Sequence, residues 1–129
     1  MNNKIVLDAS ALLALAQDEK GAEVIKPLLK FTVMSTVNIA ESLTALQRRN
    51  IEPDDAMNLI NDIIASIIPF DLDQAAEAAR LNQLVKHKGL SLGDRACIAL
   101  GIQLQAPIYT ADKIWAELNI DKADIKLIR

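Results

Sequence analysis

Short apolar runs alternate along the chain with longer segments in which apolar positions recur every three or four residues. The short runs are rich in branched residues and predict buried strands at residues 5–7, 31–34, 67–70, 107–109 and 125–128. The longer segments predict helices at residues 10–15, 22–30, 37–49, 53–66, 72–88, 91–105 and 113–118. Strands that alternate with helices in this way indicate a layered α/β fold with a mainly parallel sheet.

Local signals place the ends of several predicted helices. Ser10 is expected to cap the first helix, and Ser35 or Thr36 is expected to cap the third. Pro27 leaves the middle of the second helix open, because a proline inside a helix removes a backbone donor.

Size and composition favour one domain, residues 1–129, with an aliphatic core. Hydrophobic residues make up 51% of the chain and aromatic residues only 3%. No run of about 18 uncharged apolar residues occurs, so a membrane span is not expected. Residues 4–17 resemble a secretory signal, but Asp8 would oppose insertion into a membrane. The single cysteine, Cys97, cannot form an internal disulfide, so we expect a cytoplasmic protein.

Two acidic residues follow predicted strands. Asp8 comes directly after the strand of residues 5–7, and Asp112 follows the strand of residues 107–109, with Thr110 between. In parallel α/β sheets, ligands bind at the carboxyl ends of the strands, so both acids are candidates for a site. Both also have a local alternative, because aspartate is a common helix N-cap.

Glu41 lies beside the apolar stripe of its predicted helix rather than on it. Asn38, Ser42 and Arg49 are expected to form the solvent side of this helix. Arg48 lies two turns beyond Glu41, about 10 Å along the helix axis, where it is placed to hold a phosphate. Glu41 is therefore either an ordinary boundary residue or part of a site.

Asp94 lies in the segment LSLGDRACIALG, three residues after Ser91, and this spacing matches a capping box. Asp94 also shares a helix face with Cys97 and Gly101, small residues that are expected to pack inward. A capping role and a role in a site both stay open.

These four acids would repel one another if the fold brought them together. Two like charges 4 Å apart repel by about 4 kcal/mol at an effective dielectric constant near 20. Such a cluster requires protons or cations, and oxygen ligands without a Cys or His cluster favour Mg²⁺ or Mn²⁺. A divalent ion held by carboxylates is suited to the hydrolysis of phosphodiesters. Because the net charge of −3 gives no sign of a nucleic-acid binder, bound ions would have to recruit such a substrate.

Four segments spread over essentially the whole chain carry a resemblance to a known family: VLDASALLAL, STVNIAESL, LSLGDRACIALG and IYTADKIWAEL. In these segments and in their order, the sequence resembles the PIN-domain ribonucleases, in the VapC branch of bacterial toxin–antitoxin toxins. LGDRACIAL and TAD are the more specific matches. The resemblance implies a three-layer α/β/α sandwich with a mainly parallel central sheet and a Mg²⁺- or Mn²⁺-dependent acidic pocket.

The same match implies the residues of the site. The acidic residues carried over are Asp8, Glu41, Asp94 and Asp112. Asp8, Asp94 and Asp112 would hold the ion, and Glu41 would complete its outer shell or orient the attacking water. Two further residues match supporting polar positions, Ser10 and Thr110.

The family also implies an activity and a partner. The activity is site-specific endoribonuclease cleavage of a structured RNA such as tRNA or rRNA, leaving a 5′-phosphate and a 3′-hydroxyl. Toxins of this family are typically homodimers inhibited by a VapB antitoxin. Candidate phosphate contacts, each of which could instead be a solvated surface residue, are Arg48, Arg49, Lys86, Lys88, Arg95 and Lys113. His87 is expected to complement a helix dipole rather than to act as a base.

Two alternatives stay open. A receiver-like domain also binds Mg²⁺ in an acidic pocket, but it requires adjacent acids after the first strand, whereas Asp8 stands alone. It also requires a phosphoacceptor aspartate after a strand, and the acid nearest that place, Glu41, is predicted to be helical. The second alternative is a catalytically silent PIN domain that acts only as a binding module.

Overall fold

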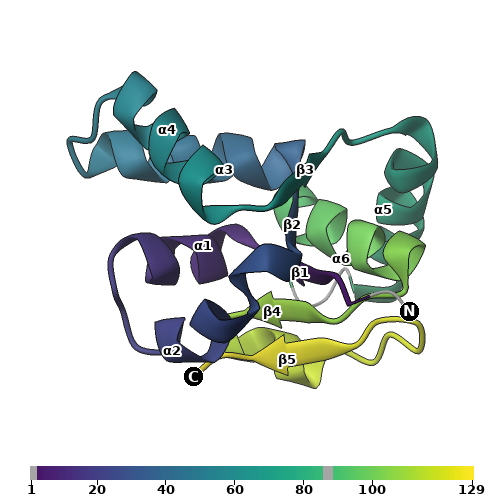
Figure 1. Cartoon of the computed structure of the whole chain (residues 1–129). Helices are drawn as coiled ribbons and strands as arrows, with labels where there is room; N and C mark the ends of the chain where they lie inside the picture. The colour runs from purple at the N-terminus through teal and green to yellow at the C-terminus, as the bar shows by residue number, and fades with distance from the viewer. Residues whose placement is uncertain (1–2, 86–88) are drawn as a thin grey trace.

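The computed structural model describes residues 3–85 and 89–129, and within them strands and helices alternate as expected (Figure 1). The strands are β1 Ile5–Leu7, β2 Thr32–Ser35, β3 Ser66–Ile68, β4 Ile108–Thr110 and β5 Ile125–Leu127. The α-helices are α1 Ala9–Ala16, α2 Ala22–Ile25, α3 Thr36–Arg48, α4 Pro53–Ile63, α5 Leu72–Val85 and α6 Leu92–Leu104. Two 3₁₀ helices are η1 Lys26–Phe31 and η3 Lys113–Glu117.

All neighbouring strands of the sheet are parallel, in the order β3-β2-β1-β4-β5. The chain first builds outward from β1 through β2 to β3, and then continues with β4 and β5 on the other side of β1. The order in which successive strands are added thus reverses between β1 and β4. In open α/β sheets, ligands bind at such a reversal point, outside the carboxyl ends of the strands. Asp8 directly follows β1, and Thr110 ends β4. The order differs from the 2-1-3-4-5 order of receiver domains, which argues against the receiver-like alternative.

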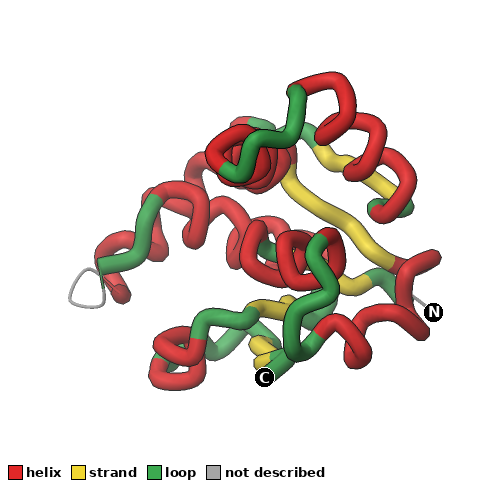
Figure 2. The backbone as a smooth tube through the Cα atoms, turned by 90° about the vertical axis from the view of Figure 1, so that its left-hand side faces the viewer, coloured by secondary structure: helices red, strands yellow, loops and turns green. Residues whose placement is uncertain are grey.

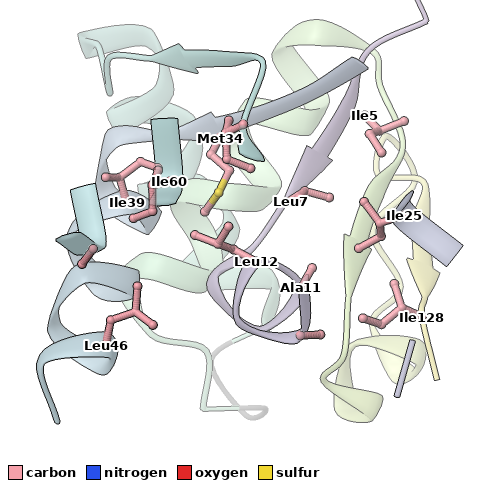
Figure 3. Close-up of a cluster of buried hydrophobic side chains, with 13 residues drawn as sticks. Ile5, Leu7, Ala11, Leu12, Ile25, Met34, Ile39, Leu46, Ile60 and Ile128 are labelled. Carbon is pink, nitrogen blue, oxygen red and sulfur yellow. The ribbon is translucent and has the colours of Figure 1, made fainter. Parts of the chain in front are cut away.

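Helices cover both faces of the sheet, which confirms the three-layer α/β/α architecture (Figure 2). Successive side chains of a strand point to opposite faces. In β1, Leu7 faces a core shared with α1, α3 and α4 (Figure 3), whereas Val6 faces a core shared with α5 and α6. Met34 and Val33 of β2 divide in the same way. Because both faces are covered, the central strand β1 reads as a continuous apolar run.

Several predicted boundaries are wrong by one or more residues. The N-cap of α1 is Asp8, not Ser10, because the extended Asp8 directs its side chain back to the backbone N–H of Ala11. The predicted helix of residues 22–30 ends as an α-helix at Ile25 and continues as η1, because Pro27 cannot donate a backbone hydrogen bond. The helix predicted over residues 53–66 ends at Ile63, and β3 begins at Ser66.

The end of the helix predicted over residues 72–88 falls outside the described residues. Within them, α5 reaches Val85. No helix in the described part of the chain is both long enough and apolar enough to cross a membrane.

Candidate active site

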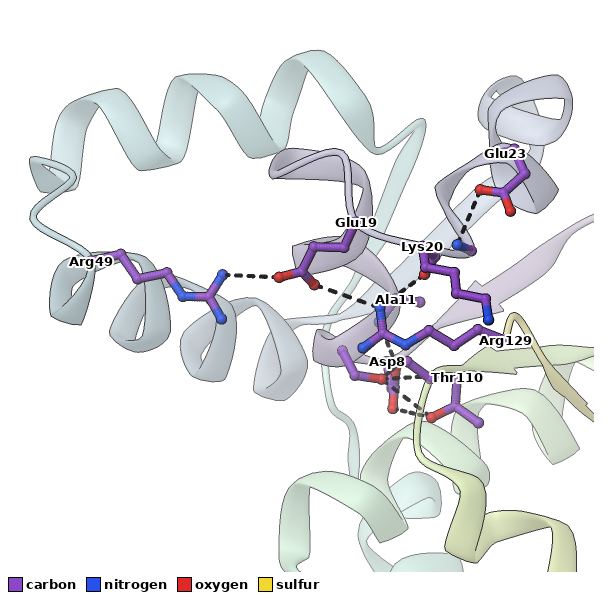
Figure 4. A network of polar contacts seen from close by, with 11 residues as sticks. Asp8, Ala11, Glu19, Lys20, Glu23, Arg49, Thr110 and Arg129 are labelled. Carbon is purple, nitrogen blue, oxygen red and sulfur yellow. Dashed lines mark hydrogen bonds and ion pairs between the residues drawn. The ribbon is translucent and has the colours of Figure 1, made fainter.

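Asp8 is a buried carboxylate between the ends of β1 and β4, with only 6% of its surface exposed. Its Oδ1 accepts hydrogen bonds from Ser10 Oγ at 2.7 Å and from the backbone N–H of Ala11 at 2.9 Å. Its Oδ2 accepts one from Thr110 Oγ1 at 2.6 Å (Figure 4). Both hydroxyl hydrogens point at the carboxylate, so Ser10 and Thr110 fix its orientation.

Burial raises the pKa of Asp8 from 3.8 to about 6, although hydrogen bonds from Thr110, Ser10 and Ala11 oppose the shift. The negative charge of Asp94 raises it further. Within the described residues, the contacts of Asp8 are hydroxyl and amide donors rather than a lysine or an arginine. The charged form of Asp8 is therefore costly in the protein without a bound cation.

The charges of three acids from separate elements act on one buried thiol. Burial raises the pKa of the Cys97 thiol, and the charges of Asp8, Asp94 and Glu41 raise it further. Cys97 lies within α6, Asp8 follows β1, and Glu41 belongs to α3. The fold thus brings these carboxylates close enough for their charges to act on the same group, although they are far apart in the sequence.

Asp94 both caps α6 and lies near Asp8. Ser91 Oγ accepts a hydrogen bond from Asp94 N at 3.1 Å, and Asp94 Oδ2 accepts one from Ser91 N at 3.1 Å. This capping box confirms the capping role. Asp94 is only half-buried, and its charge still acts on Asp8. The two roles are compatible because the first turn of α6 faces the site.

Glu41 is held by a residue that was expected on the solvent side of its helix. Asn38 is only 1% exposed and Ser42 is fully buried, so this expectation is wrong for both. Asn38 Nδ2 donates to Glu41 Oε1 at 2.9 Å and to the backbone carbonyl of Gly93 at 3.0 Å. The reason is tertiary, because the start of α6 packs on this side of α3. Asn38 is the residue of the site that sequence reasoning missed; its spacing of three from Glu41 was the available signal.

Asp112 joins the group through Thr110. Thr110 Oγ1, which donates to Asp8, also accepts a hydrogen bond from Asp112 N at 3.0 Å. Asp112 Oδ1 accepts one from the backbone N–H of Ile114 at 3.0 Å and thereby caps η3. Asp112 is half-buried. The predicted strand-end location and the predicted capping role both occur.

One of these acids, Glu41, lines a groove of about 590 Å³. Its walls come from α3 and from the first residues of α6: Val37, Ala40, Glu41, Thr44, Arg48, Ser91, Leu92 and Gly93. Glu41 and Arg48 therefore line one groove, as the two-turn spacing predicts. A carboxylate and a guanidinium within one groove can contact different parts of a phosphodiester.

The other candidate bases contact other parts of the protein, are exposed, or lie outside the described residues. Arg49 Nη1 lies 3.9 Å from Glu19 Oε2, and Arg129 Nη1 lies 3.8 Å from Glu19 Oε1 (Figure 4). Arg95 Nη1 donates to the carbonyl of Ala78 at 2.9 Å and so joins α6 to α5. Lys113 is exposed in η3. The predictions for Lys86, His87 and Lys88 fall outside the described residues.

The chemistry of the donors fits a hard divalent cation. All candidate ligands are carboxylate or hydroxyl oxygens, and the buried Asp8 carries a charge that a cation would stabilise. In residues 3–85 and 89–129, however, no three His, Cys, Asp or Glu side chains approach closely enough to hold an ion together. Each acid is instead tied to its own donor: Asp94 to Ser91 N, Glu41 to Asn38 and Asp112 to Ile114 N. An ion in contact with Asp8, Asp94 and Asp112 together would therefore need a change in the side-chain conformation of these aspartates.

Comparisons with known proteins agree with this architecture. A chain of the DNA-bound VapBC complex from Salmonella typhimurium has a TM-score of 0.77 at 13% identity, with 98% of this chain and 99% of that chain covered. VapBC-5 from Mycobacterium tuberculosis gives 0.64 at 21% identity, covering 100% and 99%. VapC20 of the same organism, described as a Sarcin-Ricin loop cleaving toxin, gives 0.69 at 16% identity, covering 92% and 98%.

These TM-scores show that the fold is shared. No curated protein matches the chain in sequence. The sequence pattern of the PIN domain matches residues 5–120, which is most of the chain. The chain therefore belongs to the PIN-domain family.

Proposed function

We propose that this protein is a Mg²⁺- or Mn²⁺-dependent, site-specific endoribonuclease, the toxin of a VapBC-type toxin–antitoxin system. One observation carries the proposal: the buried Asp8 lies at the reversal point of the sheet, and Glu41 of α3 packs against Gly93, the residue before Asp94 in α6. Such an anionic site at the carboxyl ends of parallel strands suits a divalent ion and a phosphodiester. The substrate is a structured RNA such as tRNA or rRNA.

Each acid has a role in this proposal. Asp8, Asp94 and Asp112 hold the ion, and Glu41 completes its outer shell or orients the attacking water. When bound, the ion supplies water activation and stabilises negative charge on the phosphate and the leaving oxygen. Ser10 and Thr110 hold the Asp8 carboxylate in one orientation through its two oxygens. Cleavage leaves a 5′-phosphate and a 3′-hydroxyl.

Arg48 is the basic residue that the groove favours for RNA contact. It lines the same groove as Glu41, and its place is supported by the spacing of two helical turns. A guanidinium there would contact a backbone phosphate beside the scissile one and add affinity without sequence specificity. Arg49 and Arg95 are weaker candidates because each already contacts a group of the protein itself.

The proposed partner is a VapB-type antitoxin, and the proposed assembly is a homodimer acting in the cytoplasm. The antitoxin is supported by the solved structures of similar fold, which include VapBC complexes from Salmonella typhimurium and Rickettsia felis. Both of those complexes contain DNA.

The test is induced expression of the protein followed by sequencing of cellular RNA 5′ ends, together with cleavage of the identified RNA by purified protein. Wild type is expected to produce a small set of new 5′-phosphate ends and to arrest growth, and EDTA should stop cleavage in vitro. Asp8→Asn and Asp94→Asn should each lose about 100-fold or more in cleavage rate while staying folded. Asp62→Asn, an exposed acid on α4, is the matched control and should cleave like wild type.

A catalytically silent PIN module is the alternative that this test separates. It is favoured by the lack of three close metal-ligating side chains among the described residues. A silent module would leave the RNA 5′ ends of induced and uninduced cells the same, and the Asp8 and Asp94 variants would then be indistinguishable from wild type in cells.

A further inference from the structure

Asn38 joins two elements of the site through one amide group. Its nitrogen donates to Glu41 Oε1 within α3 and to the backbone carbonyl of Gly93 in the first turn of α6. Both hydrogens of the amide are therefore used, one on the acid and one on the neighbouring helix. The side chain lies almost wholly inside the protein, 1% exposed, at the contact between α3 and α6.

The orientation of this amide follows from its partners. Both neighbours, a carboxylate oxygen and a carbonyl oxygen, are acceptors, so an amide turned by 180° would place its own oxygen against them. In the observed orientation, Asn38 Oδ1 is buried and has no hydrogen-bond partner among the described residues. A residue that only filled space would not bury an unpaired oxygen, because that is unfavourable. The position thus uses the donor side of the amide.

The backbone of Gly93 lies close to the carboxylate of Glu41. A Cβ atom at this position would lie 2.0 Å from Glu41 Oε2, 2.3 Å from Cδ and 2.5 Å from Oε1. The carboxylate of Glu41 thus occupies the space that a side chain at residue 93 would take. The backbone of Gly93 has no positive φ that would itself require glycine, so the effect of a larger residue here would be to displace the Glu41 carboxylate.

We propose that Asn38 is a positioning residue that acts through Glu41, and that Asn38 and Gly93 together form a clasp that fixes the Glu41 carboxylate beside the first turn of α6. The inference deepens the proposed ribonuclease function and rests on it. The clasp sets where Glu41 lies relative to Asp94, the third residue of α6. Asn38, which holds Glu41, is hydrogen-bonded to the carbonyl of Gly93 in the same turn that carries Asp94. Loss of either part frees a flexible glutamate at the edge of the groove.

Two variants test the clasp from opposite sides, with one matched control. Asn38→Ala removes the donor, and Gly93→Ala pushes the carboxylate out of its place while Asn38 stays intact. The control is Ser42→Ala, which removes another buried hydrogen bond of α3, from Ser42 Oγ to Asn38 O, without touching Glu41. Urea unfolding measures the stability of each variant. Cleavage of the RNA identified above gives kcat and KM, and calorimetry without RNA gives the affinity for Mn²⁺.

The clasp predicts a loss in kcat rather than in KM. Asn38→Ala and Gly93→Ala should each lower kcat by about 10-fold to 100-fold, with a similar weakening of Mn²⁺ binding, as for other residues that orient metal ligands. Ser42→Ala should leave kcat and the affinity for Mn²⁺ unchanged, even if it lowers the stability of the protein. In a Glu41→Ala background, adding Asn38→Ala should have no further effect on Mn²⁺ affinity, because coupled residues are not additive.

Clear outcomes would overturn the inference without touching the proposed function. Wild-type kcat and Mn²⁺ affinity in both clasp variants, with cleavage lost in Glu41→Gln, would show that Glu41 needs no clasp. Equal losses in Asn38→Ala and Ser42→Ala would show that Asn38 acts only through the stability of α3. A wild-type protein that cleaves no RNA would instead contradict the proposed function, while the Mn²⁺ affinities would still decide whether the clasp exists.

Discussion

Asp8 is a buried carboxylate whose only described partners are neutral donors, and this makes it sensitive to pH. Its pKa in the folded protein is about 6, against 3.8 for an exposed aspartate. Between these two values the folded state binds the proton more tightly than the unfolded state, so stability falls as pH rises through this window. The charged form at neutral pH therefore destabilises the fold by about 3 kcal/mol, since one pH unit corresponds to about 1.4 kcal/mol.

We predict that Asp8→Asn stabilises the metal-free protein at pH 7.5 by about 1–3 kcal/mol, because it removes this buried charge and asparagine is also a good N-cap. Near pH 4, where Asp8 is protonated in the folded protein, the gain should largely vanish. Urea unfolding with EDTA at the two pH values measures both. A variant that is less stable than wild type at pH 7.5 would show that hydrogen bonds from Ser10 and Thr110 outweigh the burial of the charge.

At the scale of elements, α6 packs closely on the sheet at a point where the side chain of Ile108 fills the space beside Gly101. Gly101 of α6 is buried, and a Cβ atom there would lie 2.3 Å from Ile108 Cγ1 of β4 and 2.4 Å from its Cδ1. Asp94 lies in the first turn of the same helix, and its charge acts on Asp8 at the end of β1. Small residues along this face of α6 thus matter for the site as well as for the core.

We predict that Gly101→Ala destabilises the protein by about 1–3 kcal/mol, because the added methyl group overpacks the contact with Ile108. Ile108→Val in the same chain should recover part of this loss, since it removes the Cδ1 atom, although alone it costs about 1 kcal/mol. Urea unfolding of the two single variants and the double variant gives the comparison. Strictly additive losses would show that the two residues are not in contact.

At the scale of the whole molecule, the candidate ion would connect segments separated by about a hundred residues. Asp8 follows the first strand, Asp94 opens α6, and Asp112 follows β4. A cation that binds only the folded chain stabilises it by about 2.7 kcal/mol at a concentration 100 times its Kd. The bound cation would attract all of these acids and so offset their mutual repulsion.

We predict that Mg²⁺ or Mn²⁺ raises the Tm of wild type by several degrees at millimolar concentration, whereas Asp8→Asn and Asp94→Asn respond weakly. Differential scanning calorimetry with and without EDTA measures this shift, and Ca²⁺ tests whether charge alone is sufficient. An identical rise in Asp62→Asn is expected. A rise of equal size in the Asp8 and Asp94 variants would place the bound ion elsewhere on the protein.

The alternation of strands and helices and the positions of the four acids could be read from the sequence, because both depend on local patterns. Apolar runs mark strands covered on both faces, and an acid that directly follows such a run must lie at a strand end. The helix ends were less accurate, since Asp8 and Ser10 are both good caps and only the backbone conformation of Asp8 selects it. The proline at 27 pointed to a break without showing that a 3₁₀ helix would follow.

Only the tertiary structure decided which polar residues are buried and what they contact. Asn38 and Ser42 lie on a face of α3 that a helical wheel assigns to solvent, and packing of α6 on that face buries both. The order of the strands likewise depends on contacts between distant segments, and it places Thr110 against Asp8. Periodicity reports only how each segment divides apolar from polar positions, whereas the free energy of packing one segment on another selects its neighbour.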